Sequence, residues 1–384
     1  MADARHTAAL YSPLQELEIR LLQLDHSTGA GASIAATLTS HSILSGVKYM
    51  ALSYAWGSEE DSQTIHVNGH ELRIRKNLYE FFNHCAQRIE SSCLLWIDQI
   101  SINQDDMEER NKQVEMMARI FNSAEEVIIW LGEGYSGSAT ALRIVSSSGE
   151  QTTQLDADEQ GALQRFFELP YWMRLWITQE IVLARKATMW LGHDSLPWHE
   201  VNRTTLSTIK KPQHWTELAR QGHKRLNQLQ RKSGVTALED MHRLSWTLVL
   251  PLSEGTQCRE LRDQIYGHLG IVKNRFKLTP RYDIPIMELY HEVVWKEVYV
   301  DFPGDGLDMK VVKEHAEFMW ELYLRLDLVA SEGQKGFEGA LRSRLLEVWE
   351  LNNSKGGARK KFDRTALKAW IKWFMYHHVK KDSE

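Results

Sequence analysis

The chain has 384 residues, of which 43% are hydrophobic, and this length and composition allow a substantial core. The formal net charge of -5 argues against a dedicated nucleic-acid-binding protein, because such a protein needs a basic surface that displaces the counterions of phosphates. Only three cysteines occur, without CxxC spacing or clustering with histidine, so the sequence encodes neither a disulfide framework nor a zinc site.

No segment has the pattern of a targeting or membrane sequence. Residues 1–18 lack the apolar core of a signal peptide. No run approaches the ~18 apolar residues that a membrane-spanning helix requires. We therefore expect a cytoplasmic protein without a transmembrane segment.

The first half of the chain alternates predicted strands and predicted helices. Short apolar runs that contain tryptophan and end near Gly or Asp are typical of buried parallel strands where they leave a sheet. Alternation on both sides of Asn68-Gly69 predicts a β-hairpin. The predicted strands are 49–57, 93–101, 126–132 and 187–192, the hairpin is 64–75, and the helices are 77–90, capped by Asn77, 105–124 and 171–186.

This order of elements predicts an α/β fold with a parallel sheet, flanked by helices on both faces and carrying a β-hairpin insertion. From about residue 200 the strand signals fade, and one helical pattern follows another. We therefore expect an α/β domain at 1–200 and a mostly helical C-terminal region at 201–384, with a boundary near the loop GHDSLPWHE.

The last thirty residues, 355–384, contain nine Lys and Arg against three Asp and Glu, with aromatic residues and lysines at helical spacing. One interpretation of this basic aromatic tail is a helix that binds a lipid surface or a calmodulin-like partner. The interpretation that we favour is a terminal helix that packs its aromatic face on the body of the protein and exposes its lysines.

The common motifs of enzymes are absent. The sequence contains no GxGxxG, GxxxxGK[ST], HExxH or GxSxG, so the usual signatures of nucleotide-binding, metal and serine-hydrolase sites are absent. His377-His378 is the only adjacent pair of histidines, and neighbours on a helix point apart, so we expect no metal site.

Glu180 has an unusual position in the predicted helix 171–186. At 100° per residue it lies in the middle of an apolar stripe. An unpaired carboxylate there would cost several kcal/mol. Glu180 therefore needs a ligand or an arginine partner, for which Arg110 and Arg174 are the candidates.

Polar and aromatic residues near the ends of the predicted strands and on the following helices form the other candidates. Ligands bind at the carboxyl ends of the strands in parallel sheets. The candidate ligand-binding residues are Ser53, Tyr54, Trp56, Gly57, Asp98, Asn103, Arg110, Arg174 and Trp176.

Several of these residues have a purely structural alternative. Asp98 is equally well explained as a cap or as a partner of Arg110. Packing and a turn explain Trp56 and Gly57. The stretch INQDDMEER is explained by a well-capped helix start, in which acidic residues crowd the first turn.

Several blocks, in order, resemble the fungal heterokaryon-incompatibility (HET) domain family. They are YMALSYAWG, LLWIDQISINQDDMEERNKQVEMMARIFNSAEEVIIWLGE, YWMRLWITQEIVLA, ELRDQIYGHLGIV and RYDIPIMELYHEVVW, and with the lead-in YSPLQELEIRLLQLDHS they cover roughly residues 11–300. Ser101 departs from the family's usual cysteine, which argues against a catalytic thiol there. The resemblance implies a protein of fungal non-self recognition and programmed cell death that forms a homo-oligomer on activation by a protein trigger.

The HET family resembles the TIR domain more distantly, which implies a TIR-like, flavodoxin-like sheet. In that comparison LSYAWGSEED takes the place of the first TIR strand and its polar loop, and LWITQE that of the helix with the catalytic glutamate. The resemblance implies that Glu180 cleaves NAD at the nicotinamide–ribose bond, with NAD as substrate and with no cofactor or metal.

The remaining assignments follow from position and chemical type. Trp56 or Tyr54 would stack on a ring of NAD. Arg110 and Arg174 would receive the pyrophosphate, and Asp98 would hold a ribose hydroxyl.

Two functional classes stay open at this point. In the first, the protein is an NAD glycohydrolase, a hydrolase acting on an N-glycosyl bond. In the second, it is a non-enzymatic signalling or oligomerisation module that at most binds a nucleotide, and the carboxylate of Glu180 only pairs with an arginine.

Overall fold

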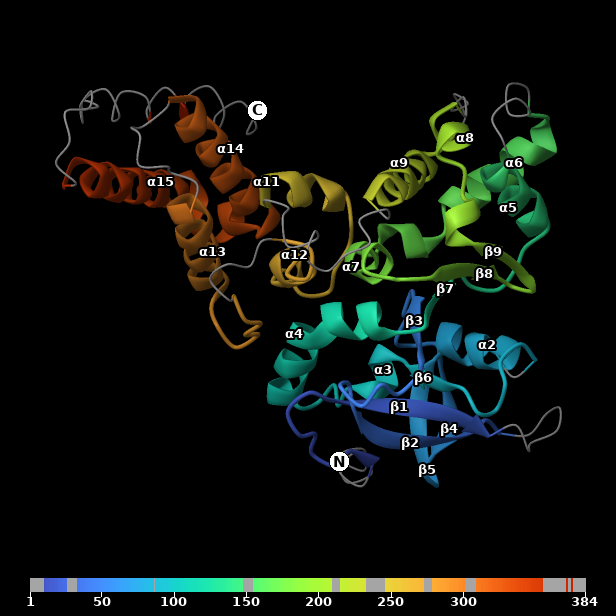
Figure 1. Cartoon of the computed structure of the whole chain (residues 1–384). Coiled ribbons are helices and arrows are strands. Elements are labelled where there is room, and N and C mark those ends of the chain that lie inside the picture. Colours follow the sequence, from blue (N-terminus) through green and yellow to red (C-terminus); the bar gives the residue numbers. More distant parts are fainter. Residues whose placement is uncertain are drawn as a thin grey trace.

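One nine-stranded sheet forms the centre of the computed structural model, with the strand order β5-β4-β2-β1-β6-β3-β7-β8-β9 (Figure 1). The structure describes residues 10–25, 33–85, 87–147, 155–208, 215–232, 246–272, 278–300, 309–354, 371 and 374–375. The strands are β1 (Glu18–Asp25), β2 (Ala35–Ser42), β3 (Met50–Tyr54), β4 (Ser62–Val67), β5 (His70–Arg75), β6 (Leu94–Trp96), β7 (Glu126–Trp130), β8 (Ala187–Leu191) and β9 (Asp194–Pro197).

The middle of the sheet is parallel, as the alternation of strands and helices predicts. β3 pairs in parallel with β6 on one side and with β7 on the other, and β7 pairs in parallel with β8. Numbered by their order in the chain, the four strands β3, β6, β7 and β8 lie in the spatial order 2-1-3-4, which matches the first four positions of the order 2-1-3-4-5. The chain therefore reverses its direction of winding between β3 and β7, and this position is the topological switch point.

The sheet as a whole is mixed, which corrects the expectation of a parallel sheet. β1 pairs antiparallel with both β2 and β6, and β9 pairs antiparallel with β8. The sequence pattern did not predict β1 and β2 as strands. Arg20 interrupts the apolar run of β1, yet it is buried at 2% exposure because a carboxylate and two carbonyls receive its guanidinium.

The predicted β-hairpin is present as β4 and β5, at one edge of the sheet. Asn68 and Gly69 connect the two strands with φ angles of 51° and 79°, the left-handed conformation that a tight hairpin turn needs at both positions. The hairpin continues the sheet rather than standing apart from it, because β4 also pairs with β2.

Helices cover both faces of the sheet and form the rest of the described structure. Along β7, Val127 and Ile129 belong to the apolar cluster under α4 to α7, whereas Ile128 and Trp130 belong to the cluster under α2 and α3. The helices of the first part are α2 (Lys76–Cys85), α3 (Asp98–Ser101), α4 (Met107–Ser123), α5 (Ser138–Ser146), α6 (Ala157–Phe167), η2 (Pro170–Met173) and α7 (Ile177–Val182). They are followed by η3 (Trp198–Glu200), α8 (Arg203–Thr208), α9 (Glu217–Lys232), α11 (Trp246–Val249), η4 (Leu250–Ser253), α12 (Asp263–Tyr266), α13 (Ile286–Val300), α14 (Met309–Arg325) and α15 (Leu328–Ser354).

The predicted helix 171–186 is broken, and this changes the surroundings of Glu180. The backbone between η2 and α7 is extended at Arg174, where φ is -70° and ψ is 134°. Met173 O accepts a hydrogen bond from Gln257 N at 2.6 Å, and Leu175 N donates to Gln257 O at 3.1 Å. These two bonds replace helical ones, so the helix begins only at Ile177.

Two predicted element starts also differ from the structure. α2 begins at Lys76, so Asn77 lies inside the helix instead of capping it. The strand predicted at 93–101 ends at Trp96, because α3 starts at Asp98. The expected start of the long helix is confirmed, since the Asp106 side chain accepts from Glu109 N at the N-terminus of α4.

After β9 the described chain is helical, as expected, and α13 to α15 form a group on the far side of α12 from the sheet (Figure 1). Most of the tail 355–384, with His377-His378, lies outside the described residues. Its described members Ile371, Phe374 and Met375 are buried in the main apolar cluster. None of the helices in the described ranges has the length and apolar content of a membrane span.

Candidate functional site

A buried hydrogen-bonded cluster surrounds Glu180, which is 1% exposed. Arg174 holds its carboxylate with two contacts, Nη1 to Oε2 at 3.1 Å and Nη2 to Oε1 at 3.2 Å. The Ser53 hydroxyl on β3 donates to Oε2 as well. Because Ser53 uses its proton in this way, the Tyr171 hydroxyl donates to Ser53 Oγ, at 2.6 Å. The four side chains bring together β3, η2, the extended link and α7.

The charges in this cluster stabilise one another. Burial lowers the pKa of the Arg174 guanidinium, but the carboxylates of Glu180 and Asp98 outweigh burial, so its pKa lies above the ordinary value. Burial raises the pKa of the Tyr171 phenol, and the Glu180 carboxylate adds to the effect. Tyr171 therefore stays protonated and remains a hydrogen-bond donor.

Asp98 joins this cluster from the neighbouring strand. It follows β6, is half-buried, and accepts a hydrogen bond from Trp56 Nε1 at 2.8 Å and another from Gln99 N at 2.7 Å. Burial raises the pKa of the Asp98 carboxyl to about 6; Arg174 lowers this pKa and Glu180 raises it. Asp98 therefore pairs with Trp56 and lies close to Arg174, instead of forming the alternative pair with Arg110.

The polar residues lie at the carboxyl ends of β3 and β6, beside the switch point. The adjoining loops are fixed by Asn77, whose side chain donates to Ala55 O at 2.5 Å and accepts from Trp130 Nε1 at 2.9 Å. Gly57 has a φ of 80° in the first of these loops, a left-handed conformation that glycine adopts without steric cost. Gly57 thus shapes the loop through its backbone.

Two aromatic candidates differ in exposure. Trp56 is half-buried, and the Arg75 guanidinium lies 4.8 Å from the centre of its ring. Tyr54 is fully buried in the cluster under α2 and α3, and its hydroxyl donates to Gln99 Oε1 at 3.1 Å. This burial corrects the expectation that Tyr54 stacks on a ligand, because its ring offers no surface.

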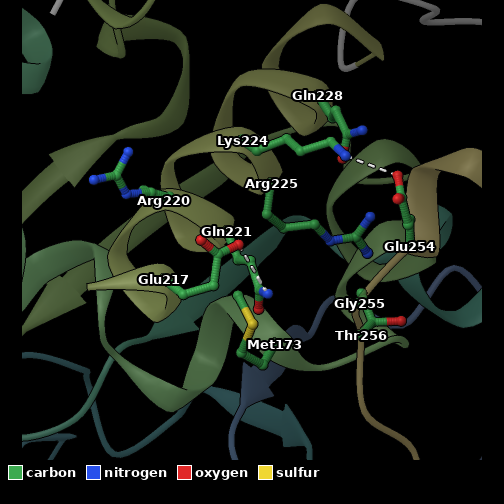
Figure 2. Close-up of a pocket in the computed structure, with 10 residues that line it drawn as sticks. All are labelled: Met173, Glu217, Arg220, Gln221, Lys224, Arg225, Gln228, Glu254, Gly255 and Thr256. Atoms are coloured by element: carbon green, nitrogen blue, oxygen red, sulfur yellow. Dashed lines mark hydrogen bonds and ion pairs between the residues drawn. The ribbon is translucent and has the colours of Figure 1, made fainter. Parts of the chain in front are cut away.

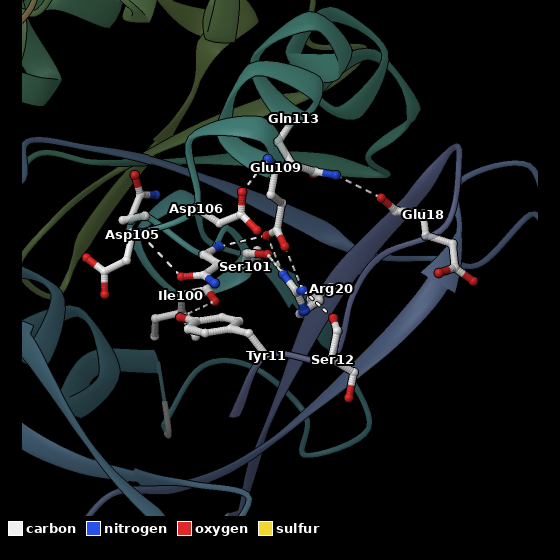
Figure 3. A network of polar contacts seen from close by, with 12 residues as sticks. Tyr11, Ser12, Glu18, Arg20, Ile100, Ser101, Asp105, Asp106, Glu109 and Gln113 are labelled. Atoms are coloured by element: carbon white, nitrogen blue, oxygen red, sulfur yellow. Dashed lines mark hydrogen bonds and ion pairs between the residues drawn. The ribbon is translucent and has the colours of Figure 1, made fainter. Parts of the chain in front are cut away.

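Asn103 belongs to a separate network that joins β1 to the start of α4. Arg20 contacts both carboxylate oxygens of Glu109, at 2.6 and 2.9 Å, and also donates to the carbonyls of Ser12 and Ser101 (Figure 3). Asn103 N donates to the same Glu109 carboxylate at 2.7 Å. The backbone of Asn103 therefore anchors the loop between α3 and α4.

Arg110 and Trp176 meet in a third group, at the contact with α12. The Arg110 guanidinium lies 4.3 Å from the centre of the Tyr282 ring. Tyr282 donates to Asp263 at 2.5 Å. Burial raises the pKa of Asp263 to about 6, against hydrogen bonds from Tyr282 and Trp176 that lower it. Arg110 is thus not the partner of Glu180.

The stretch that carries these residues matches a known family. The family model described as Heterokaryon incompatibility protein (HET) matches residues 49–180, from the residue before β3 to Glu180. Over this stretch the chain is similar to the HET-domain family. Heterokaryon incompatibility protein 6, OR allele, of Neurospora crassa is 31% identical to it over 145 residues. These residues are 35% of this chain and 21% of the relative, so the match spans about a fifth of that protein's length, and no solved structure matches the chain.

The stretch that matches the HET family, 49–180, contains all members of the Glu180 cluster, whereas the partners of Arg110 and Trp176 lie outside it. Two residues that contact the candidates, Tyr171 and Gln99, were not among the candidates themselves. Both stand in the quoted family blocks, Gln99 directly after Asp98 and Tyr171 three residues before Arg174, and that proximity was the signal that could have found them. Within the described residues, no three His, Cys, Asp or Glu side chains group together closely enough to hold a metal ion.

Proposed function

We propose that this HET domain cleaves NAD at the nicotinamide–ribose bond, with Glu180 as the catalytic carboxylate. The observation that carries the proposal is the position of Glu180, a buried carboxylate bonded to the carboxyl end of β3, which borders the switch point. The distant resemblance of HET domains to TIR domains supports the same residue. Buried acids beside strand ends are common sites of tuned acid–base and electrostatic chemistry.

The reaction needs the groups that this cluster contains. When the bond between ribose C1′ and nicotinamide breaks, the electron pair leaves with nicotinamide, which becomes neutral, and positive charge remains on the ribose. A carboxylate at that position stabilises the oxocarbenium-like transition state, more strongly in a dry site than in water. Water then adds to C1′, and the Glu180 carboxylate accepts its proton. Asp98 would hold a ribose hydroxyl, and Trp56 would contact a ring.

Arg174 is the more exposed member of its ion pair with Glu180. The side chain of Glu180 is 2% exposed, whereas that of Arg174 is 17% exposed, so a ligand reaches the arginine first. In the proposed reaction the pyrophosphate of NAD replaces Glu180 as the partner of the Arg174 guanidinium, because arginine binds phosphate with two parallel hydrogen bonds. The freed carboxylate then faces the ribose.

The relative from Neurospora crassa is named for heterokaryon incompatibility. We propose that this chain acts in the same process, in the cytoplasm, and that a protein trigger and association with further copies of the chain activate it. Consumption of NAD would then account for programmed cell death.

A second candidate function is a non-enzymatic signalling or oligomerisation module. The observation that favours it is the ion pair itself, since the two contacts from Arg174 and the hydroxyl of Ser53 satisfy Glu180 without a ligand. In that case the cluster is a structural link between β3 and α7, and the residue serves stability alone.

The test is release of nicotinamide from NAD by the purified chain, at high protein concentration so that copies can associate. We expect release by the wild type and only background release by Glu180→Gln. The matched control is Glu109→Gln, which removes a carboxylate from a comparably buried pair with Arg20, outside the cluster. Breaking a buried pair costs roughly 3–5 kcal/mol, so both variants lose stability and only one loses turnover.

Turnover by folded Glu180→Gln at the wild-type rate would contradict the catalytic assignment. A folded wild type that releases no nicotinamide at any concentration from NAD or NADP would favour the signalling module. Urea unfolding of all three proteins, run in parallel, separates loss of activity from loss of fold.

A further inference from the structure

A pocket of about 240 Å³ lies between α9 and the loop that follows η4, and Met173, from the stretch that matches the HET family, belongs to its wall. Figure 2 shows its walls, with Arg220, Lys224 and Arg225 projecting from α9 and Glu254 to Thr256 on the opposite side. At ~30 Å³ for each water molecule, this volume has room for a phosphate-sized group with its hydration. None of the candidate residues from the sequence lines it.

Arg225 is the unusual member of this wall. Its side chain is buried at 2% exposure, and its Nη2 donates to Thr178 Oγ1 and to Leu175 O. Its Nε and Nη1 are buried and have no hydrogen-bond partner among the described residues. Buried guanidinium donors without an acceptor are costly, and in native proteins they usually mark a missing water, ion or ligand.

The charges around Arg225 do not compensate it. Two acidic residues, Glu217 and Glu254, line the pocket, and Glu254 forms an ion pair with Lys224 at 2.7 Å. Arg325 adds a second guanidinium nearby, and it is itself bonded to Ser253 and Glu321. Burial lowers the pKa of Arg225 to about 9, and Arg325 acts in the same direction. No carboxylate within the described part of the chain forms an ion pair with Arg225.

We infer that this pocket binds the phosphoryl group of a small anionic ligand, with Arg225 as its principal donor. Phosphate oxygens would accept from the unused Nε and Nη1, and Lys224 would supply a second positive charge at the mouth. A phosphoryl group fits better than a single carboxylate, because it offers three acceptor oxygens to several donors. The inference does not depend on the proposed NAD cleavage.

The pocket is connected to the Glu180 cluster through Arg225. The guanidinium contacts Leu175, just before α7, and Thr178 in the first turn of α7, two residues before Glu180. An anion on Arg225 would therefore alter the contacts of the turn that carries the carboxylate. Such a ligand is positioned to modulate the Glu180 cluster.

The test is the effect of inorganic phosphate on the melting temperature of the full chain, compared with sodium chloride at the same ionic strength. Phosphate at a hundred times its dissociation constant should raise Tm by about 3 °C in the wild type. Arg225→Met should melt at the same temperature as the wild type or higher without phosphate, because it removes an uncompensated buried charge, and phosphate should not shift it.

The control is Arg165→Met, which removes an exposed positive charge on α6 away from the pocket and should keep the full phosphate shift. Adenosine monophosphate distinguishes the source of the phosphoryl group: a shift larger than that of phosphate identifies a nucleotide, and an equal shift identifies the phosphoryl group alone. Equal effects of phosphate and chloride on the wild type, or an unchanged phosphate shift in Arg225→Met, would overturn the inference.

Discussion

Asp98 is held in the folded protein with a pKa of about 6, against a value of 3.8 for an unperturbed aspartate. Burial is the main cause, since the charged form loses hydration that Arg174 and Trp56 replace only in part. Between these two pH values the folded state binds more protons than the unfolded chain. The resulting stabilisation is complete below about pH 4 and is lost as the pH rises through 6.

We therefore expect Asp98→Asn to gain stability relative to the wild type as the pH rises. At pH 5 most of the wild-type side chain is protonated and resembles asparagine, so the two free energies of unfolding should be close. At pH 7.5 only the wild type carries the buried charge. Urea unfolding at both pH values measures the difference between the two proteins.

The free energies of unfolding of Asp98→Asn and the wild type must be compared at each pH, because a second buried acid of the wild type titrates in the same pH range. Burial raises the pKa of Asp263 to about 6 as well, so the wild-type profile alone mixes the two groups. A constant difference between Asp98→Asn and the wild type from pH 5 to pH 7.5 would show that Asp98 is ordinary.

The sequence indicated the central residue of the site and offered two arginines as its partner. Glu180 was recognisable because a carboxylate among apolar neighbours requires a partner, and Arg174 was one of the two arginines expected to supply it. Arg110 could not be excluded from spacing, since its actual partner, Tyr282, comes from a segment more than 170 residues away. Contacts of this kind depend on how the segment around Tyr282 packs against α4, which periodicity does not encode.

The packing of α9 on α6 depends on one small residue. A Cβ on Gly222 would lie 1.9 Å from Phe167 O, a backbone atom at the C-terminus of α6. The two helices therefore approach more closely than any side chain would permit. This close contact also holds α9, and with it Arg225, against the stretch that matches the HET family.

Gly222→Ala should destabilise the protein by about 3 kcal/mol or more, because relief of the clash requires a shift of the backbone. The comparison variant is Gly161→Ala, inside α6, where an added Cβ meets nothing within 4 Å. That change should stabilise by roughly 0.5–1 kcal/mol, since alanine restricts the unfolded chain. Chemical denaturation measures the free energy of unfolding of both variants and checks that the two changes have opposite signs. An unchanged stability of Gly222→Ala would show that the helices can separate at little cost.

Elements with regular patterns were predictable, and elements stabilised by distant contacts were not. β3, β7 and β8 correspond to apolar runs, and the turn Asn68-Gly69 fixed the hairpin. β1 was missed because Arg20 breaks its pattern, and its burial depends on Glu109, 89 residues away. The break in 171–186 depends on hydrogen bonds to Gln257, which lies outside any local window.

The residues that match the HET family contain only part of the sheet. The match, 49–180, contains β3 to β7, whereas β1 and β2 precede it and β8 and β9 follow it. β1 covers the edge of β6, and β8 covers the edge of β7. The division into an α/β domain at 1–200 and a helical region at 201–384 stays a prediction.

A fragment of residues 49–180 should therefore fail to fold by itself. Removal of β1 and β8 exposes two edges of its parallel strands, and unpaired edges promote aggregation. We expect an insoluble product, or one without the near-ultraviolet circular dichroism of the full chain. Cooperative urea unfolding of the soluble fragment would contradict this expectation and would make the HET match an independent folding unit.

The side chain of Asn77 spans the switch point, with one hydrogen bond to the loop after β3 and one to Trp130 at the end of β7. Loops at these two strand ends are the places where α/β proteins usually change their ligands independently. Here one amide joins them, so that a displacement of either loop is transmitted to the other. The two loops are therefore expected to move together. A relative with an insertion in one of these loops is expected to carry a compensating change in the other loop or at position 77.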